Sequence, residues 1–451
     1  MAKFFGTNGI RKKVEELSPE FVAGICAAFA SYSKGGTILI GRDTRTSGEM
    51  IANAAIAGLT SAGARVVDLG VVPAPTVEFL VHKRKANGGI IVTAPHNPPE
   101  WNALKFVDGN GIGITSERGE EIERIYLEGK SKRAGWSDIK NVEKDERAIR
   151  EHIDGIKKFV DCAKTEKKKL HVVLDCGNGT ASLIAPYLFR EMGCGVTTIN
   201  SHPDGFFPGR NSEPSRENIA DLVASVPLLK ADLGIAWDGD ADRVIFVDEK
   251  GSYIIGDKSF ALCVKIKLAQ KGVKKLSATT VATSNVVKEV TENAGGKLVY
   301  TAVGGPYLSE VIRKDGAAIA GEEVGGVIWP EIHPGKDGLF TAAKIVEAVC
   351  EKPLSKLIGE LPEYYNSKTK IVCEGKKKFE AIEKLIGLAK KEGKGKLTLV
   401  DGIRIDFEKS WVIARPSGTE NYIRVFAEAK SAEEAKTLMG KYAKMVEELC
   451  R

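Results

Sequence analysis

Short apolar runs alternate with longer segments of helical character along most of the chain. Several of these runs are rich in Val, Ile and Leu and lead straight into loops of Gly, Asp or Pro, which predicts buried strands. The predicted strands are residues 37–40, 65–69, 90–93, 171–175, 233–237, 244–247 and 317–320. This alternation is typical of α/β domains, in which helices cover a parallel or mixed sheet.

The pattern changes towards the C-terminus. Residues 368–373, 397–407, 410–414 and 423–429 are predicted to be strands of a small sheet, and a helix follows that begins with Ser431 and Glu434 in capping-box spacing. We therefore expect a separate α+β domain here. Near the other end, Ser18 and Pro19 predict the start of a helix over 21–29.

Three breaks in the pattern divide the chain into four predicted domains. The breaks are a charged stretch at 140–151, the end of the strand at 247–248 and the Pro-containing segment 361–366. The predicted domains are 1–148, 149–248, 249–362 and 363–451. A chain of 451 residues is long enough for such an arrangement.

Composition and charge limit the possible functions. No apolar run approaches the ~18 residues of a membrane span, and the first residues lack the apolar core of a signal peptide, so a cytoplasmic protein without membrane association is expected. The net charge is +6, and the small Lys clusters have no interleaved aromatic residues. This favours anionic small molecules over nucleic acid.

The eight cysteines form no CxxC pair, which predicts reduced thiols. The sequence carries no signal for the oligomeric state.

The segment DGDADR at 238–243 lies between two predicted strands. Its carboxylates at Asp238, Asp240 and Asp242 can converge on one hard divalent cation and leave positions for phosphate oxygens. The spacing resembles the start of a calcium loop, but the order of that motif is not met, so Mg²⁺ is favoured. The alternative is an acidic loop tip without a ligand.

Three other loops carry candidate chemistry. The segment RPSGTE at 415–420, with Arg424 on the next strand, is either a phosphate clamp or a plain turn. The segment GEEVGG at 321–326 can accept hydrogen bonds from sugar hydroxyls, or it is an ordinary loop. In TAPHNPPEWN at 93–102, His96 is a possible proton handler or phosphate ligand, as is Lys105 just beyond, or His96 is only a hydrogen-bonding residue.

Taken together, these motifs resemble the α-D-phosphohexomutase superfamily, and most closely archaeal phosphoglucosamine mutases and phosphomannomutase/phosphoglucomutase relatives. The matching segments occur in family order: FGTNGIR, GRDTRTSGEM, TAPHNPPEWNALK, LDCGNGT, HPDGFFPGRNSEP, DGDADR, GEEVGG and RPSGTE. The resemblance implies three α/β domains and a C-terminal phosphate-binding domain around a central cleft. It also implies the Mg²⁺-dependent interconversion of a hexose 6-phosphate and its 1-phosphate, with glucosamine 6-phosphate as the favoured substrate and a sugar 1,6-bisphosphate as intermediate or activator.

The same resemblance implies roles for single residues. The metal ligands would be Asp238, Asp240 and Asp242, and Arg11, His96 and Lys105 would assist phosphoryl and proton transfer. Substrate contacts would come from Arg243, Glu322, Val324, Arg415, Ser417, Gly418, Thr419 and Arg424.

The chain departs from the family where the family carries its phosphoserine, because Pro95 stands there and has no hydroxyl. Val324 also replaces a polar residue, Asn8 an Asp and Asn421 a Pro, which affects the expected choice of sugar. Two hypotheses follow: a mutase with a substitute acceptor such as Thr93 or His96, or a paralogue that binds sugar phosphates without turnover. A phosphatase with an aspartyl nucleophile is disfavoured, because the expected DxDx[TV] order is absent.

Overall fold

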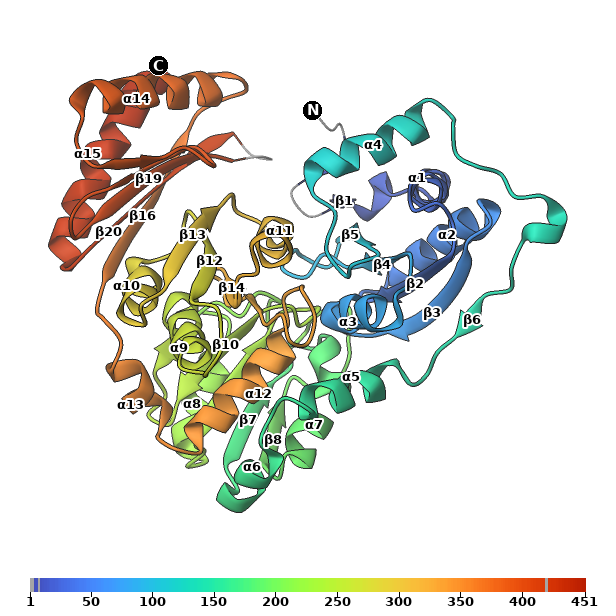
Figure 1. Ribbon diagram of the computed structural model, residues 1–451, viewed down its shortest axis with the longest axis horizontal. Helices are drawn as coiled ribbons and strands as arrows, with labels where there is room; N and C mark the ends of the chain where they lie inside the picture. The colour runs from blue at the N-terminus through green and yellow to red at the C-terminus, as the bar shows by residue number, and fades with distance from the viewer. Residues whose placement is uncertain (1–3, 7–8, 418–420) are drawn as a thin grey trace.

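The computed structural model describes residues 4–6, 9–417 and 421–451, which fold into four units that follow one another around an arc (Figure 1). The first unit contains a six-stranded sheet in the order β1-β5-β4-β2-β3-β6. Its strands are β1 (Ile10–Lys13), β2 (Thr37–Arg42), β3 (Arg65–Val71), β4 (Gly88–Val92), β5 (Trp101–Asp108) and β6 (Glu143–Lys144), and its helices are α1 (Pro19–Tyr32), α2 (Gly48–Ser61), α3 (Ala74–Arg84) and α4 (Ser116–Leu127).

Helices cover both faces of this first sheet because its strands are apolar on both sides. Along β2, Ile38 and Ile40 pack into the cluster of buried side chains that includes α1 and α2, whereas Leu39 packs into the cluster that includes α3. This alternation follows from the two-residue period of a strand. The N-terminus of α1 is capped as expected, since the Ser18 side chain accepts a hydrogen bond from the backbone N–H of Phe21 at 3.3 Å.

The second unit has a five-stranded sheet in the order β11-β10-β9-β7-β8. Strands β7, β8 and β9 are parallel, and β9 turns back into β10 as an antiparallel hairpin. The strands are β7 (His171–Asp175), β8 (Gly195–Ile199), β9 (Leu233–Trp237), β10 (Val244–Asp248) and β11 (Tyr253–Ile254), and the helices are α5 (Ala148–Lys157), α6 (Cys162–Lys168), α7 (Ala185–Glu191) and α8 (Ala220–Leu228).

The third unit has the sheet order β13-β12-β14-β15, and the fourth an antiparallel sheet in the order β16-β20-β19-β18-β17. The third contains α9 (Gly256–Leu268), β12 (Leu276–Thr280), α10 (Asn285–Asn293), β13 (Lys297–Thr301), α11 (Gly305–Asp315), β14 (Ile319–Gly321), β15 (Val327–Ile328), α12 (Gly338–Val349) and α13 (Leu354–Gly359). The fourth contains β16 (Tyr365–Val372), α14 (Lys377–Glu392), β17 (Lys396–Thr398), β18 (Ile403–Asp406), β19 (Trp411–Pro416), β20 (Tyr422–Ala429) and α15 (Ala432–Cys450).

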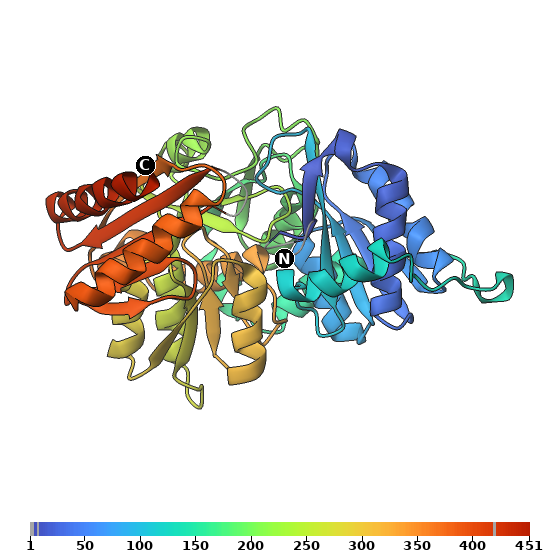
Figure 2. The same cartoon turned by 90° about the horizontal axis from the view of Figure 1, so that it is seen from above.

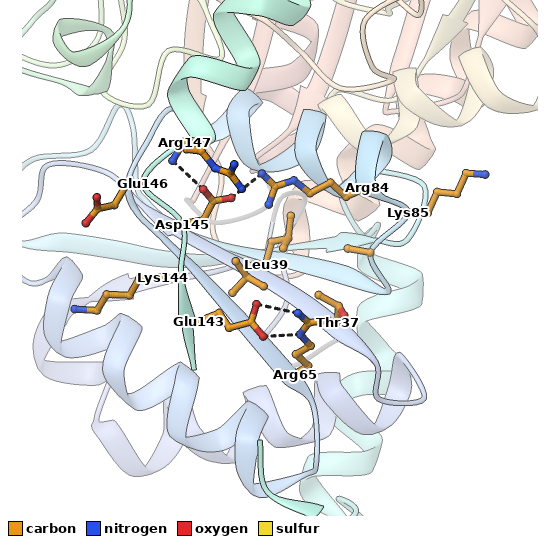
Figure 3. Close-up of a pocket in the computed structure, with 12 residues that line it drawn as sticks. Thr37, Leu39, Arg65, Arg84, Lys85, Glu143, Lys144, Asp145, Glu146 and Arg147 are labelled. Atoms are coloured by element: carbon orange, nitrogen blue, oxygen red, sulfur yellow. Dashed lines mark hydrogen bonds and ion pairs between the residues drawn. The ribbon is translucent and has the colours of Figure 1, made fainter. Parts of the chain in front are cut away.

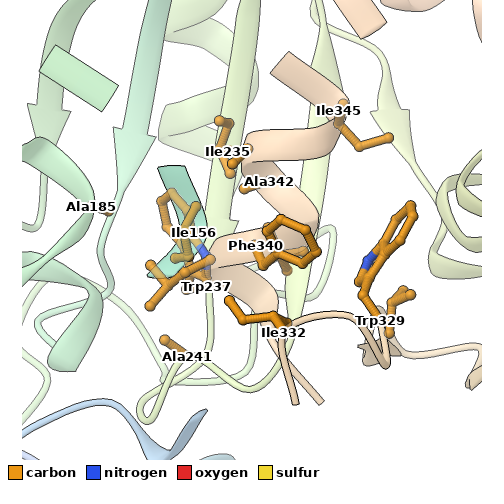
Figure 4. Close-up of a cluster of buried hydrophobic side chains, with 14 of the residues drawn as sticks. Ile156, Ala185, Ile235, Trp237, Ala241, Trp329, Ile332, Phe340, Ala342 and Ile345 are labelled. Carbon is orange, nitrogen blue, oxygen red and sulfur yellow. The ribbon is translucent and has the colours of Figure 1, made fainter. Parts of the chain in front are cut away.

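One hydrophobic cluster runs through the first three units, whereas the fourth unit has a cluster of its own. Figure 4 shows where the second and third units share this core: Phe340 and Ala342 of α12 lie beside Ile235 and Trp237 of β9. The fourth unit, orange to red in Figure 2, lies against the third unit, which is drawn in yellow. Its buried Arg404 donates to the carbonyl oxygens of Val281 and Thr283 of the third unit, both at 2.9 Å.

The α/β interpretation is confirmed, and every strand predicted in the first three units overlaps an observed strand. One strand prediction was wrong: residues 397–407 form two strands, β17 and β18. Gly402 lies between them at φ 79°, and a side chain there would come within 2.3 Å of the Ala414 carbonyl oxygen. The predicted helix start at Ser431 is confirmed, since the Ser431 side chain accepts from the N–H of Glu434. Within the described residues, we find no helix with the length and apolar character to cross a membrane.

Candidate functional site

The predicted metal loop is the hairpin that joins β9 to β10. It is tight, because Ala241 adopts the left-handed conformation (φ 62°) and donates its N–H to the Asp238 carbonyl oxygen at 3.2 Å. The side chains of Asp238, Asp240 and Asp242 are all buried, and one carboxylate oxygen from each lies within 4.8 Å of the others. The i, i+2, i+4 spacing therefore brings three carboxylates to one point.

Two lysines from other parts of the chain balance this negative charge. Lys105 of β5 lies 2.7 Å from Oδ2 of Asp240, and Lys336 lies 3.0 Å from Oδ2 of Asp242. Burial opposes ionisation of Asp242, but Lys336, Lys105 and Arg243 hold its pKa well below the usual range. Burial and the two neighbouring carboxylates raise the pKa of Asp238 well above its usual range.

Two carboxylate oxygens in this loop are buried without a hydrogen-bond partner among the described residues. They are Oδ2 of Asp238 and Oδ1 of Asp242. A buried carboxylate oxygen without a partner is costly, and a bound cation would remove that cost. Both oxygens lie near Nε of Arg243, at 4.0 Å and 3.7 Å, but receive no hydrogen bond from it. Three converging carboxylates with such oxygens fit a hard divalent cation such as Mg²⁺.

The segment 93–102 lies against the metal loop and is held there by Arg45. The Arg45 guanidinium donates to the carbonyl oxygens of Asn97 at 2.7 Å and Pro98 at 2.6 Å, and also to those of Ala94 and Trp101. The carbonyl oxygen of Pro95 faces the N–H of Gly239 at 3.4 Å. The backbone of residue 95 thus lies beside the carboxylate loop, but its side chain has no group that could accept a phosphoryl group.

His96, which belongs to this segment, lies next to Arg11. Nη1 of Arg11, on β1, is 2.7 Å from Nε2 of His96, and it also donates to Asn97. Since a guanidinium only donates, Nε2 must accept and the ring proton lies on Nδ1, which is buried and has no partner among the described residues. Burial, together with the charges of Arg243 and Arg11, lowers the pKa of His96 to about 2. The imidazole is therefore neutral at physiological pH.

The GEEVGG segment brings a fourth acidic group to the site. Oε1 of Glu322 lies 2.9 Å from Nζ of Lys336 and 3.7 Å from Nε of Arg243. The segment packs closely on the metal hairpin, because the carbonyl oxygen of Gly325 accepts from the N–H of Val244 at 3.1 Å. Val324 is half-buried and offers only its backbone for polar contacts. Glu322 therefore joins Arg243 and Lys105 around the three aspartates.

The predicted phosphate clamp belongs to the fourth unit. Arg415 lies within β19 rather than after it, and its Nε donates to Oδ2 of Asp401 at 2.6 Å. Arg424 on β20 donates to the Tyr422 hydroxyl, and its Nε is buried without a hydrogen-bond partner in the described part of the chain. The carbonyl oxygen of Ser417 accepts from Nζ of Lys378 at 2.6 Å. Gly418 and Thr419 lie outside the described residues.

Lys336 is the main functional residue that the sequence analysis missed. Its ammonium group bridges Asp242 of the metal loop and Glu322 of the GEEVGG loop, and it fills space left free by Gly326, where a side chain would lie 2.5 Å from its Cδ. The glycine-flanked segment GKDG after a strand was the available signal. Lysine at such a position does not by itself indicate a partner, because both partners are distant in the sequence.

Two of the recognised motifs support the metal loop rather than form the site. Arg210 donates to Oδ2 of Asp175 at 2.7 Å and to the carbonyl oxygen of Trp237, the residue before Asp238. The N–H of Thr180 donates to the carbonyl oxygen of Gly239 at 3.0 Å. The segments LDCGNGT and HPDGFFPGRNSEP therefore fix the first half of the hairpin loop, at Trp237 and Gly239.

A cavity of about 570 Å³ lies elsewhere, beneath β6 in the first unit (Figure 3). Two ion pairs lie in its walls: Arg65 binds Glu143, and Arg84 binds Asp145 at 2.6 Å. None of the predicted site residues lines it. The candidate site is therefore the cluster around the metal hairpin and not this cavity.

Comparison with known proteins agrees with the arrangement of these loops. The chain matches all four parts of one family description: phosphoglucomutase/phosphomannomutase, alpha/beta/alpha domains I, II and III over residues 2–133, 150–251 and 255–365, and the C-terminal domain over 369–445. The chain belongs to the phosphoglucomutase/phosphomannomutase family. The expected membership of the α-D-phosphohexomutase superfamily is thereby confirmed.

Relatives of this family member are similar over almost their whole length. A phosphoglucomutase/phosphomannomutase of Thermococcus kodakarensis is 42% identical, with 99% of each chain covered. A probable phosphoglucosamine mutase of Methanopyrus kandleri is 40% identical, with 99% of this chain and 98% of the relative covered. The crystal structure of a phosphoglucomutase/phosphomannomutase family protein from Burkholderia thailandensis superimposes with a TM-score of 0.88 at 25% identity, over 99% of this chain and 97% of that one. These relatives are sugar-phosphate mutases by name or family, which are isomerases.

Proposed function

We propose that the protein is a Mg²⁺-dependent phosphohexomutase that interconverts a hexose 6-phosphate and its 1-phosphate, with glucosamine phosphate as the best candidate substrate. The observation that supports this most strongly is the buried aspartate hairpin with unused oxygens, surrounded by Arg243, Lys105 and Glu322. Relatives named phosphoglucosamine mutase support the choice of sugar. The eight free cysteines are compatible with a reducing, cytoplasmic setting.

In this proposal, the chain's own residues bind and neutralise the reacting phosphate. Asp238, Asp240 and Asp242 would hold Mg²⁺, which when bound supplies positive charge to phosphoryl oxygens. Arg11 and Arg243 point their guanidinium groups towards the same region, since Arg11 contacts His96 and Arg243 lies 3.7 Å from Asp242. Arg415, Ser417, Gly418, Thr419 and Arg424 would bind the other phosphate, and Val324 would limit polar contacts to the sugar. A sugar 1,6-bisphosphate would be the intermediate.

The residues near Pro95 limit which side chain could replace the family's phosphoserine. Thr93 is fully buried, and its hydroxyl donates to Oδ2 of Asp43 at 2.7 Å, so it is already used inside the protein. His96 is neutral, and in the tautomer set by Arg11 its nucleophilic lone pair lies on Nε2, where it accepts a hydrogen bond from that guanidinium. The lone pair would become free when Arg11 turns its N–H to a bound phosphoryl group. We therefore propose His96 as the carrier.

Phosphoryl transfer to His96 is chemically balanced. The Nε2 lone pair would form the N–P bond as the P–O bond to the sugar breaks, and the electron pair would leave on the sugar oxygen. The sugar oxygen would take up a proton from water, and the phosphorylated ring would keep its Nδ1 proton as an imidazolium. In the return step, a sugar hydroxyl would attack phosphorus and lose its proton to water, the N–P bond would break, and its electron pair would return to Nε2. Arg11 and Arg243 would offset the charge of the phosphoryl oxygens.

The function is tested by ³¹P NMR of the purified protein with Mg²⁺, glucosamine 6-phosphate and a trace of its 1,6-bisphosphate. Appearance of the 1-phosphate signal is the expected result. Absence of that signal, with the sugar phosphate still bound in a calorimetric titration, would instead support a paralogue that binds without turnover. Glucose and mannose 6-phosphates in parallel samples would identify the preferred sugar.

Replacement of His96 tests the carrier. His96→Asn keeps a polar side chain for Arg11 but removes the nucleophile, so we expect turnover to fall by about a hundredfold or more. We also expect that the wild-type protein, treated with the 1,6-bisphosphate, carries a phosphate that is labile in acid and stable in alkali, as phosphohistidine is. Peptide mass spectrometry would locate it. An acid-stable phosphate on a serine or threonine would contradict the assignment to His96.

A further inference from the structure

A chain of buried polar side chains connects three units of the protein behind the metal hairpin. The Thr76 hydroxyl on α3 lies 2.8 Å from Nδ1 of His152 on α5, and Nε2 of His152 lies 2.9 Å from Oδ2 of Asp337, which precedes α12. All three side chains have no exposed surface. The order of groups is similar to a hydroxyl–imidazole–carboxylate triad, but substrate cannot reach any of them. Their role must therefore be exerted through other residues.

Asp337 connects the hydrogen-bonded side chains Thr76 and His152 to the start of α12. Its Oδ1 accepts from the N–H groups of Leu339 and Phe340, both at 2.9 Å, and its Oδ2 accepts from both His152 and His333. Burial opposes its ionisation, but the two imidazoles keep its pKa below the usual range. One oxygen of this buried carboxylate thus holds the first turn of α12, and the other ties that turn to the two imidazoles.

The first turn of α12 in turn contacts the metal hairpin. The N–H of Gly338 donates to the carbonyl oxygen of Ala241 at 3.2 Å, and its carbonyl oxygen accepts from the indole N–H of Trp237 at 3.1 Å. A side chain at Gly338 would lie 2.8 Å from the Ala241 oxygen, so the backbones approach closely. On the other side of Asp337, Lys336 contacts the Asp242 carboxylate.

Helix α3 also contacts this hairpin, at the neighbouring residue Asp240. The N–H of Ala74, in the first turn of α3, donates to the carbonyl oxygen of Asp240 at 2.9 Å. Thr76 lies in the same turn and begins the polar chain. The hairpin is therefore held between the starts of two helices, and the Thr76–His152–Asp337 chain fixes these starts relative to each other.

We infer that Thr76, His152 and Asp337 are positioning residues of the cation site: they set the geometry of the aspartate hairpin by joining α3, α5 and α12. This inference rests on the proposed Mg²⁺ site. Groups behind metal ligands that orient them commonly change metal affinity by 10–100-fold when they are replaced. A purely structural role would instead lower the stability of the fold and leave the affinity for Mg²⁺ unchanged.

The test is calorimetric titration of the full chain with MgCl₂ in the absence of sugar phosphate. Asp337→Asn turns an NH₂ group towards imidazole N–H groups, and we expect it to weaken Mg²⁺ binding by about 10–100-fold. Thr76→Val keeps the shape but removes the hydroxyl, and we expect a smaller loss in the same direction. Thr76→Ser keeps the hydroxyl and is expected to bind Mg²⁺ as the wild type does.

The controls separate the possible outcomes. Leu385→Ala leaves a cavity in the core of the fourth unit, so it lowers the stability of the protein. It does not alter the Thr76–His152–Asp337 hydrogen bonds and should not change the affinity for Mg²⁺. Equal Mg²⁺ affinity in Thr76→Val, Thr76→Ser and wild type would overturn the inference, even if Asp337→Asn does not fold. Wild-type protein that binds no Mg²⁺ would overturn the metal site itself and the inference with it.

Discussion

Pro95→Ser is expected to raise mutase turnover by at least about a hundredfold. Residue 95 lies beside the metal hairpin, since a side chain at Gly239 would come within 3.5 Å of the Pro95 Cα. A serine introduced there would place a hydroxyl on the residue that lies against the metal hairpin at Gly239. Loss of a serine nucleophile costs roughly a millionfold in other enzymes, so recovery of part of this factor is a large effect.

The backbone around Pro95 should tolerate the change. The segment is held by carbonyl groups bonded to Arg45, and these bonds do not involve the proline ring. Pro95→Ala is the matched control, because it removes the ring without adding a hydroxyl. The measurement is the initial rate of 1-phosphate formation, together with the acid stability of the enzyme-bound phosphate. Equal rates for the Ser and Ala variants would contradict a nucleophile deficit at this position.

Asp240→Asn is expected to weaken Mg²⁺ binding by about a hundredfold or more, and turnover should fall with it. Asp240 is the central carboxylate of the hairpin, fully buried and 2.7 Å from Lys105. The amide keeps the shape and one oxygen, but it removes a negative charge where water cannot screen the loss. Hard divalent cations bind chiefly to charged oxygen ligands, so the affinity should fall steeply.

Calorimetric titration with MgCl₂ measures this effect. Asp248→Asn is the matched control, since Asp248 is also buried and ends the second strand of the same hairpin, where its carboxylate holds the turn through Lys250 and Ser252. The Asp248→Asn variant should bind Mg²⁺ with the affinity of the wild type. Unchanged affinity in Asp240→Asn would remove the aspartate hairpin from consideration as the metal site.

The local chemistry of the site could be predicted because it is encoded in short segments. The three aspartates follow a buried strand at two-residue intervals, so a tight turn must bring them together whatever surrounds it. The helix starts at Ser18 and Ser431 are also local, because each needs only a side chain and a backbone N–H three residues on. The absence of a hydroxyl at residue 95 is visible in the sequence itself.

The sequence could not show which distant groups complete the site. Lys336 reaches Asp242 across 94 residues of chain, and Arg45 holds carbonyl groups about 50 residues away. Thr93 is two residues from Pro95, so it lies on the same side of an extended strand and could be considered as an acceptor. The structure shows that its hydroxyl is already hydrogen-bonded to Asp43. Backbone carbonyl groups, which hold much of this site in place, are identical at every position and leave no trace in composition.

The sequence by itself determined the α/β class, the order of the family motifs and the identity of the charged groups in each loop, because strand period, capping and loop spacing act over a few residues. Tertiary structure decided which of these groups meet, which are neutral and which are already bonded inside the protein. Those outcomes depend on burial and on contacts between segments far apart in the chain, and both exist only once the four units have packed.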